Sequence, residues 1–382
     1  MRLSDSRSEG RFRAELESWL AENEPAADRL SDPPRSTGHI PGWAREWQRT
    51  LFEAGWLVPR WPPELGGRDA GAVEQMIYLE ELSRRRLTRT TNPQGLDVCA
   101  PTLVDLGRGR QRDEWVPATL QGELSWCVAV DESEPGDGTS GLVATGERDG
   151  ALTVQGTVPA PAGAGHADRC LGALWAPKAR GRPDGVALVA IDLAAPGVLR
   201  PDADTDALAF EDVALSEDEI VGAGEQGWAA VQSVRARLRS VRWIISLLAI
   251  QRALEALADV GRGRGLADDA VFRDTLAGLQ VDADAVRALA YRALAKQGTG
   301  RPNPELAMLP LVTREVEQRI YLVGVESLGT DGLDLGLDGP QAWPSGSWAS
   351  EWLDATAEAA ATGGLPAERD RVSGRVLGLR LH

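Results

Sequence analysis

The sequence contains little of what metal sites and disulfide frameworks are built from. Only three histidines and three cysteines occur among its 382 residues. The cysteines are odd in number, lie far apart and form no CxxC pair, so we expect neither a zinc site nor a disulfide framework. This cysteine usage is typical of a reducing cytoplasm. The three residues are Cys99, Cys127 and Cys170.

Long apolar runs are also missing. The most apolar stretch, residues 243–250, is far shorter than the roughly 20 apolar residues of a transmembrane helix. Residues 1–5 carry charge where a signal peptide would have an apolar run. The sequence therefore predicts a soluble, cytoplasmic protein without a membrane-spanning segment.

Positive charge is in short supply as well. The chain has 57 acidic and 41 basic residues, which gives a formal net charge of −16. Binding to nucleic acid needs clustered Lys and Arg to neutralise phosphates, so this balance argues against it. The hydrophobic fraction of 43% is nevertheless sufficient for a large buried core. At roughly 150 residues per domain, the length allows two or three packed units.

Hydrophobic periodicity divides the chain into three sections, which together predict a multi-layer α+β fold. Residues 1–124 are predicted to form an N-terminal α-helical domain, because Phe12, Leu16 and Leu20 recur at four-residue spacing and similar stripes follow. Residues 125–221 alternate short apolar runs with Gly and Pro. That pattern is typical of strands and turns, and it predicts a middle β-barrel or β-sandwich domain.

The third section, residues 222–382, returns to helical spacing. Apolar residues three or four positions apart form stripes over residues 228–248, 276–289 and 306–323. A last helix is expected around Trp348. Long amphipathic helices of this kind predict a C-terminal four-helix bundle.

A glycine-rich string at residues 136–141 fits the expression GxGxxG. A dinucleotide-binding fingerprint requires a helix to begin there, so that its N-terminal amides meet the pyrophosphate. The residues that follow, 142–146, have the composition of a strand instead. We therefore expect a turn of the β domain and not a Rossmann phosphate loop.

Histidine chemistry has few candidates, because His382 is terminal and only His39 and His166 lie inside the chain. A Ser–His–Asp hydrolase would have to use His166 with Asp168, yet the sequence has no nucleophile-elbow motif. We expect His166 to lie in a surface loop. No group of metal-ligand residues supports metal catalysis.

Short strings in a fixed order carry a family resemblance. Residues 55–67, GWLVPRWPPELGG, match the pattern GW-x-x-P-x-W-P-x-E-x-GG, and further strings follow at 80–82, 101–103, 196–198 and 375–379. In this order they resemble the acyl-CoA dehydrogenase family. They are similar to its actinobacterial members that act on steroid-CoA or other bulky thioesters, several of which are heteromers. The resemblance implies the three domains predicted above, FAD as cofactor and an acyl thioester as substrate.

The resemblance also indicates where a catalytic base should lie. In the family a Glu removes the α-proton of the thioester while hydride leaves Cβ for the flavin. One family position for that Glu falls on Leu238, and the other falls on Thr362. Neither side chain can act as a carboxylate base. The candidate substitutes are Glu358, one helical turn before Thr362, and the pair His166 and Asp168.

The positions that should contact the flavin are altered too. A family element with an aromatic ring and hydroxyls that contact the isoalloxazine is replaced by Ala160, Pro161 and Ala162. One register of the flavin loop puts Asp137 where the family has a pyrophosphate-binding Ser, and a carboxylate there would repel the phosphates. The positions left as candidate cofactor contacts are Trp126, Val128, Gly136, Gly138 and Arg262.

Three hypotheses follow from the resemblance. In the first, the chain is a catalytically degenerate subunit of a homo- or hetero-oligomer with another acyl-CoA dehydrogenase-type subunit, and FAD binds weakly or depends on that partner. In the second, it is a repurposed non-redox enzyme of secondary metabolism that acts on an acyl group carried by CoA or a carrier protein. In the third, it is an active FAD-dependent dehydrogenase whose displaced base is Glu358.

Overall fold

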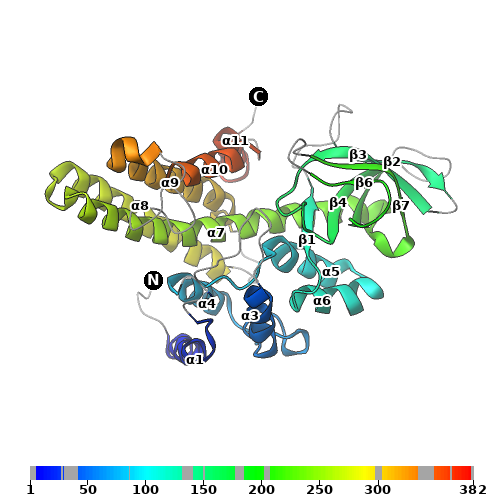
Figure 1. The fold of residues 1–382 in the computed structure, drawn as a ribbon, viewed down its shortest axis with the longest axis horizontal. Helices are drawn as coiled ribbons and strands as arrows, with labels where there is room; N and C mark the ends of the chain where they lie inside the picture. The colour runs from blue at the N-terminus through cyan, green and yellow to red at the C-terminus, as the bar shows by residue number, and fades with distance from the viewer. Residues whose placement is uncertain are drawn as a thin grey trace. The chain divides into compact units, whose positions relative to one another are not determined.

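The computed structural model describes residues 6–26, 29, 42–85, 87–130, 141–148, 151–176, 185–201, 207–296, 303–333, 348–361 and 364–379. Two compact units make up the chain (Figure 1). The bundle unit comprises Met1–Glu17, Gly71–Leu87 and Arg239–His382, and the sheet unit comprises Ser18–Ala70 and Thr88–Leu238.

The sheet unit contains short helices that precede its strands. In α3 (Gly42–Glu53), Ala44, Trp47 and Leu51 are buried at the three- and four-residue spacing of a helix face. Trp47 donates a hydrogen bond from Nε1 to the carbonyl of Thr88 at 2.9 Å. The helices α5 and α6 each follow a π-helical turn, a feature that occurs frequently at functional sites. Their bounds are η2 (Gly95–Cys99), α5 (Ala100–Leu106), η3 (Gln111–Trp115) and α6 (Val116–Leu120).

The GW…GG segment that carried the resemblance forms a tight loop after α3. Gly55 and Gly66 have φ of 73° and 82°, which glycine adopts more readily than other residues. A Cβ on Gly67 would lie 1.9 Å from the carbonyl oxygen of Trp61, so a side chain has no space there. The guanidinium of Arg68 lies 3.9 Å from the ring centroid of the buried Trp56. The pattern thus reflects backbone packing and not a binding site.

The strands of the sheet unit form one curled eight-stranded sheet. The strand order is β6-β7-β3-β2-β4-β5-β8, and β1 pairs with β4 beside this path. β4 pairs in parallel with β1 and β2 and antiparallel with β5. The strands are β1 (Trp126–Ala129), β2 (Gly141–Arg148), β3 (Ala151–Pro159), β4 (Arg169–Ala176), β5 (Gly185–Asp192), β6 (Val198–Leu199), β7 (Ala207–Leu215) and β8 (Ile220–Gly222).

The centre of this sheet is buried on both faces at β5. Six consecutive residues of β5, from Val186 to Ile191, are buried, as expected of a strand covered on both sides. The strand β2 begins at Gly141, directly after the GxGxxG string. The expected strand there is therefore confirmed, while Gly136 and Gly138 belong to residues 131–140, which the structure does not describe.

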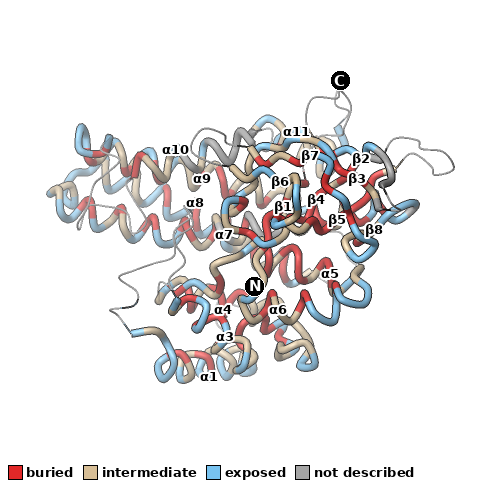
Figure 2. The backbone as a smooth tube through the Cα atoms, turned by 45° about the vertical axis from the view of Figure 1, so that its right-hand side comes forward, coloured by how far each residue is buried: buried red, intermediate tan, exposed pale blue. Residues whose placement is uncertain are grey.

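The bundle unit is built around α9 (Glu305–Leu328), which packs against α8 (Ala270–Lys296), α10 (Trp348–Ala361) and α11 (Gly364–Arg375). α4 (Ala72–Arg84) packs against α8, and the later part of α7 (Gly227–Gly263) also belongs to this unit. Buried positions recur along α8 and α9 with exposed ones between them (Figure 2). The predicted long helices are confirmed, and α11 is one more than the stripes indicated.

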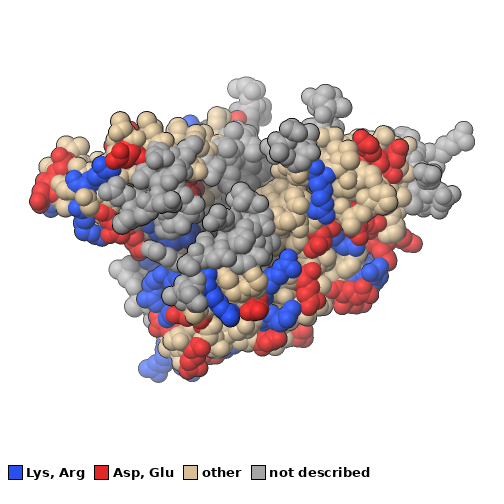
Figure 3. Space-filling view, in the orientation of Figure 1, with Lys and Arg blue, Asp and Glu red and all other residues tan. Residues whose placement is uncertain are grey.

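The remaining helical elements are short or lie near the N-terminus. They are α1 (Arg7–Asn23), η1 (Pro63–Leu65), η4 (Glu217–Glu219), η5 (Gly224–Gln226), η6 (Leu266–Asp268) and η7 (Gly329–Leu333). Among the described helices, none combines the length and apolarity needed to cross a bilayer. On the face drawn in Figure 3, acidic side chains are interspersed with basic ones.

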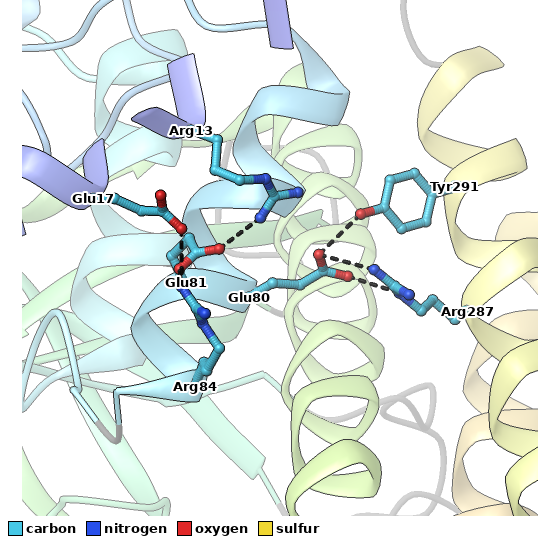
Figure 4. A network of polar contacts seen from close by, with 7 residues as sticks. All are labelled: Arg13, Glu17, Glu80, Glu81, Arg84, Arg287 and Tyr291. Carbon is cyan, nitrogen blue, oxygen red and sulfur yellow. Dashed lines mark hydrogen bonds and ion pairs between the residues drawn. The ribbon is translucent and has the colours of Figure 1, made fainter. Parts of the chain in front are cut away.

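A buried carboxylate joins α1 to α4 within the bundle unit (Figure 4). Glu81 is 3% exposed and accepts a hydrogen bond from Nη1 of Arg13 at 2.6 Å. Its other carboxylate oxygen pairs with Arg84, which also reaches Glu17 at 3.0 Å. The hydrogen bond and attraction of Glu81 raise the pKa of Arg84. Two guanidinium groups thus neutralise the buried charge, which a solitary carboxylate could not sustain.

The neighbouring residue Glu80 connects α4 to α8 in the same way (Figure 4). Its two carboxylate oxygens accept hydrogen bonds from Arg287 at 2.9 and 3.2 Å, a bidentate arrangement. The hydroxyl of Tyr291 donates to Glu80 at 3.1 Å. Burial, with the nearby Glu80 charge, raises the pKa of Tyr291 to about 12. Consecutive glutamates of α4 therefore hold two different helices.

Replacing Glu81 tests the buried carboxylate. We expect Glu81→Gln to lower the free energy of unfolding by about 2 kcal/mol, because charge-assisted hydrogen bonds to Arg13 and Arg84 are lost. Urea unfolding followed by circular dichroism measures the change. The matched control is Glu46→Gln, which breaks the exposed Arg29–Glu46 pair and should cost less than about 0.5 kcal/mol. Equal effects in the two variants would contradict the expectation.

Candidate functional site

The candidate site lies along the edge of β1 that faces away from β4. Alternate residues of a strand direct their backbone groups to opposite edges, and β4 occupies one edge of β1. On the other edge, Trp126 N–H donates to Oδ1 of Asn92 at 2.9 Å, and Nδ2 of Asn92 donates to the Trp126 carbonyl at 2.7 Å. Val128 N–H donates to Oε1 of Gln94 at 3.0 Å. Two side-chain amides thus take the place of a neighbouring strand.

Local geometry holds Asn92 in this position. Its backbone N–H donates to Oγ1 of Thr90 at 3.0 Å, which forms a turn before η2. A Cβ on Gly95 would lie 1.9 Å from Oδ1 of Asn92, so glycine is needed where η2 begins. The Asn92-Pro93 dipeptide is a turn signal in the sequence, but its partner on β1 is 34 residues away. Sequence reasoning missed both Asn92 and Gln94 for this reason.

The side chain of Trp126, a predicted cofactor contact, is fully buried. Its Nε1 donates to Oγ1 of Thr119 at 2.8 Å. Its ring meets that of Trp115 edge-on, with centroids 6.1 Å apart. Protein groups therefore contact the indole as well as the backbone of Trp126, and Gln94 takes the amide of Val128, the second predicted contact.

The structure does not bring His166 and Asp168 together as an acid–base pair. Oδ2 of Asp168 accepts hydrogen bonds from the backbone N–H and the hydroxyl of Ser125, at 2.8 and 2.7 Å. Among the described residues, no hydrogen bond joins the His166 imidazole to this carboxylate. Arg200 donates to the Ala167 carbonyl at 2.9 Å, and it thereby fixes the loop that carries His166. Asp168 holds the start of β4 beside β1.

Leu238, at the first family position of the base, is half-buried in α7. It extends the apolar stripe of Val231 and Val234, both of which are buried. One turn earlier, Arg235 is 7% exposed and lies 5.3 Å from the ring centroid of Trp228. Arg237 forms an ion pair with Asp105 of α5. No carboxylate replaces the missing Glu on this stretch of described helix, and an aliphatic group cannot accept a proton.

The other predicted site residues give less structural information. Thr362 lies outside the described residues, and so does the side chain of Glu358, whose backbone is part of α10. Arg262 is exposed at the end of α7 and forms an ion pair with Asp259, three residues earlier. It belongs to the bundle unit.

The three cysteines form a buried cluster that their sequence positions do not reveal. Cys127 of β1 and Cys170 of β4 are directly paired in register, and both are fully buried with Cys99. Contact with Cys127, together with burial, raises the pKa of Cys170, and burial raises the pKa of Cys99. All three are free thiols. No group of His, Cys, Asp or Glu in the described part of the chain could hold a metal ion.

The described residues do not fit a flavin ring on their own. The segment after β3 carries Ala160, Pro161 and Ala162, which offer neither an aromatic ring nor a hydroxyl, and Pro161 has no backbone N–H. The outward backbone groups of β1 are already hydrogen-bonded to Asn92 and Gln94. A flavin at this edge would have to displace those amides or obtain its polar contacts elsewhere.

Comparisons with known proteins decide the family. The sequence model "Acyl-CoA dehydrogenase, N-terminal domain" matches residues 6–123, and "Acyl-CoA dehydrogenase, C-terminal domain" matches residues 225–373. The chain belongs to the acyl-CoA dehydrogenase family. Residue by residue, this acyl-CoA dehydrogenase-family chain is similar to "Acyl-CoA dehydrogenase IpdE1" of Mycobacterium tuberculosis, with 24% identity over 96% of this chain and 97% of the relative. The IpdE1 of Mycolicibacterium smegmatis is 25% identical over the same shares.

Solved structures of the family share the fold of this acyl-CoA dehydrogenase-type chain. The "Tcur3481-Tcur3483 steroid ACAD" superposes with a TM-score of 0.80 and 21% identity, and the match covers all of both chains. The ChsE4-ChsE5 complex from Mycobacterium tuberculosis gives a TM-score of 0.73 and 19% identity, again with full coverage. The helical N-terminus, curled middle sheet and helical C-terminal region are therefore those of the acyl-CoA dehydrogenase fold.

Replacing Asn92 tests the closure of β1. We expect Asn92→Ala to lower the free energy of unfolding by about 2 kcal/mol, because the buried N–H and carbonyl of Trp126 lose their partners. Tryptophan fluorescence during urea unfolding measures the change.

The control is Asn23→Ala, which removes a hydrogen bond from an exposed Asn to the Trp19 carbonyl. It should change stability by less than about 0.5 kcal/mol. A loss in the Asn92 variant no greater than that of the control would show that the amide does not hold the strand.

Proposed function

We propose that this chain is a non-catalytic subunit of a heteromeric, FAD-dependent acyl-CoA dehydrogenase that acts on a bulky acyl thioester. The observation that carries the proposal is Leu238. At a family position of the base, α7 presents a half-buried aliphatic side chain that continues a packing stripe. The second family position, Thr362, is also not a carboxylate. The α-proton of a thioester must then be removed by a residue of another subunit.

The polar contacts of β1 support the same assignment. Asn92 and Gln94 occupy the backbone groups of Trp126 and Val128 that the resemblance offers to the cofactor. Closing that edge stabilises the sheet of this chain and leaves the flavin contacts to a partner. In this proposal the chain contributes a rigid sheet and a helical bundle to the assembly, and its partner contributes the base.

The comparisons support a partner of the same family. The titles of two structures that share this fold each name two components, Tcur3481 with Tcur3483 and ChsE4 with ChsE5. One of those titles names a steroid acyl-CoA dehydrogenase. A bulky acyl group on CoA is the substrate class that we propose for the assembly of this chain.

Flavin content tests the proposal directly. We expect the chain purified alone to show no visible flavin absorption. Co-expressed with an acyl-CoA dehydrogenase-type subunit encoded by a neighbouring gene, it should yield a yellow complex with one flavin for each pair of unlike subunits. Absorbance and protein quantification provide the ratio. Flavin bound by the lone chain would contradict the proposal, whereas absence of flavin from both preparations would favour a repurposed, non-redox pocket.

Glu358 provides a second test, because it is the candidate base if the chain is catalytic itself. In the co-expressed complex we expect Glu358→Gln to leave turnover within twofold of the unmodified complex, since the partner supplies the base. Bleaching of the bound flavin by a panel of branched and cyclic acyl-CoA thioesters measures the reaction. Abolished bleaching with normal flavin content would instead assign the base to this chain.

A further inference from the structure

A groove of about 570 Å³ lies on the bundle unit among α8, α9, α10 and α11. Its floor includes Val286 and Val316, which are buried, and its upper wall includes Leu322, which is 40% exposed. Trp352 of α10 and Leu365 of α11 close the opposite side. The groove thus runs over α9 between neighbouring helices and is lined mainly by apolar side chains.

The charged residues at this groove are already paired with one another. Arg319 binds Asp282 at 2.6 Å, and Arg369 binds Glu315 at 2.7 Å. Each pair joins α9 to a different helix, so the two pairs also hold the walls of the groove in place. Because the two cations have partners within the chain, the groove is not suited to the phosphates of CoA. Its free surface is apolar, and it fits an apolar occupant.

Exposed apolar side chains are concentrated on the same unit. Ten large hydrophobic residues are exposed in the described part of the chain, and seven of them belong to the bundle unit. Val281 lies one helical turn before Ala285 of the groove, and Leu353 follows Trp352. Apolar surface that extends beyond a groove in this way is typical of a protein interface. The seven are Val271, Val281, Leu322, Leu333, Leu353, Leu377 and Leu379.

We propose that this groove receives the apolar face of a helix from the second, acyl-CoA dehydrogenase-type subunit. The inference rests on the proposed function and names where that partner binds. Grooves between packed helices accept the ridge of a further helix, with anchors three or four residues apart. A second copy of this chain is the poorer occupant, because each copy carries a net charge of −16 and two copies repel each other.

The test is Leu322→Glu in the chain co-expressed with its partner subunit. Leu322 is already 40% exposed, so the substitution should not disturb the bundle. At a packed interface it would bury an unpaired carboxylate, and we expect the dissociation constant of the complex to rise at least tenfold. The control is Leu199→Glu in β6, where the residue is 50% exposed and lies in the sheet unit. That variant should bind the partner normally.

Size-exclusion chromatography with light scattering measures the assembly, and circular dichroism confirms that each variant folds. Leu322→Arg serves as a second variant, and it should weaken binding as Leu322→Glu does if the contact is apolar. Normal assembly of both Leu322 variants would overturn the groove proposal and leave the proposed function standing. Failure of the unmodified chain to bind the partner would overturn both. A homodimer of the lone chain that Leu322→Glu disrupts would overturn the choice of occupant.

Discussion

A strand has hydrogen-bonding groups on two edges, and in β1 only one of those edges meets another strand. β4 satisfies the first edge. The second would leave buried amide and carbonyl groups without partners, each at a cost of about 1–3 kcal/mol. Asn92 and Gln94 supply those partners from the turn before η2. The position of the N-terminal helices beside the sheet, the glycine at position 95 and the burial of Trp126 all depend on this closure.

The same closure bears on function. A protein that binds a flat heterocycle along a strand must keep polar backbone groups available to it, yet β1 has its own covered by side chains. Leu238 shows a comparable change in α7, where a packing residue stands at a position that catalysis would need. Arg235, one turn earlier, is buried against Trp228, so this helix face is filled by packing. These features describe a subunit whose interior is complete and whose chemistry lies in another chain.

Electrostatics in the bundle unit follows one rule, which is that buried carboxylates have cationic partners. Glu81 has Arg13 and Arg84, and Glu305, which is 3% exposed, has Lys296 at 2.5 Å and Arg292 at 3.1 Å. The hydrogen bond from Lys296 lowers the pKa of Glu305. The excess negative charge of the chain therefore lies mostly on its surface, where water and salt screen it. An apolar groove with paired charges is the surface that such a molecule can cover at low cost.

The sequence alone determined the helices, the order of the domains' elements and the absence of a carboxylate at Leu238 and Thr362. Helical spacing predicted α8 and α9 because burial of one face repeats every three or four residues, whatever the partner is. The tertiary structure decided which residues meet. Cys127 and Cys170 became neighbours through strand register, and Asp168 bonded Ser125, 43 residues earlier, instead of His166. Periodicity reports how deeply a residue is buried, but the identity of its partner depends on how distant segments pair.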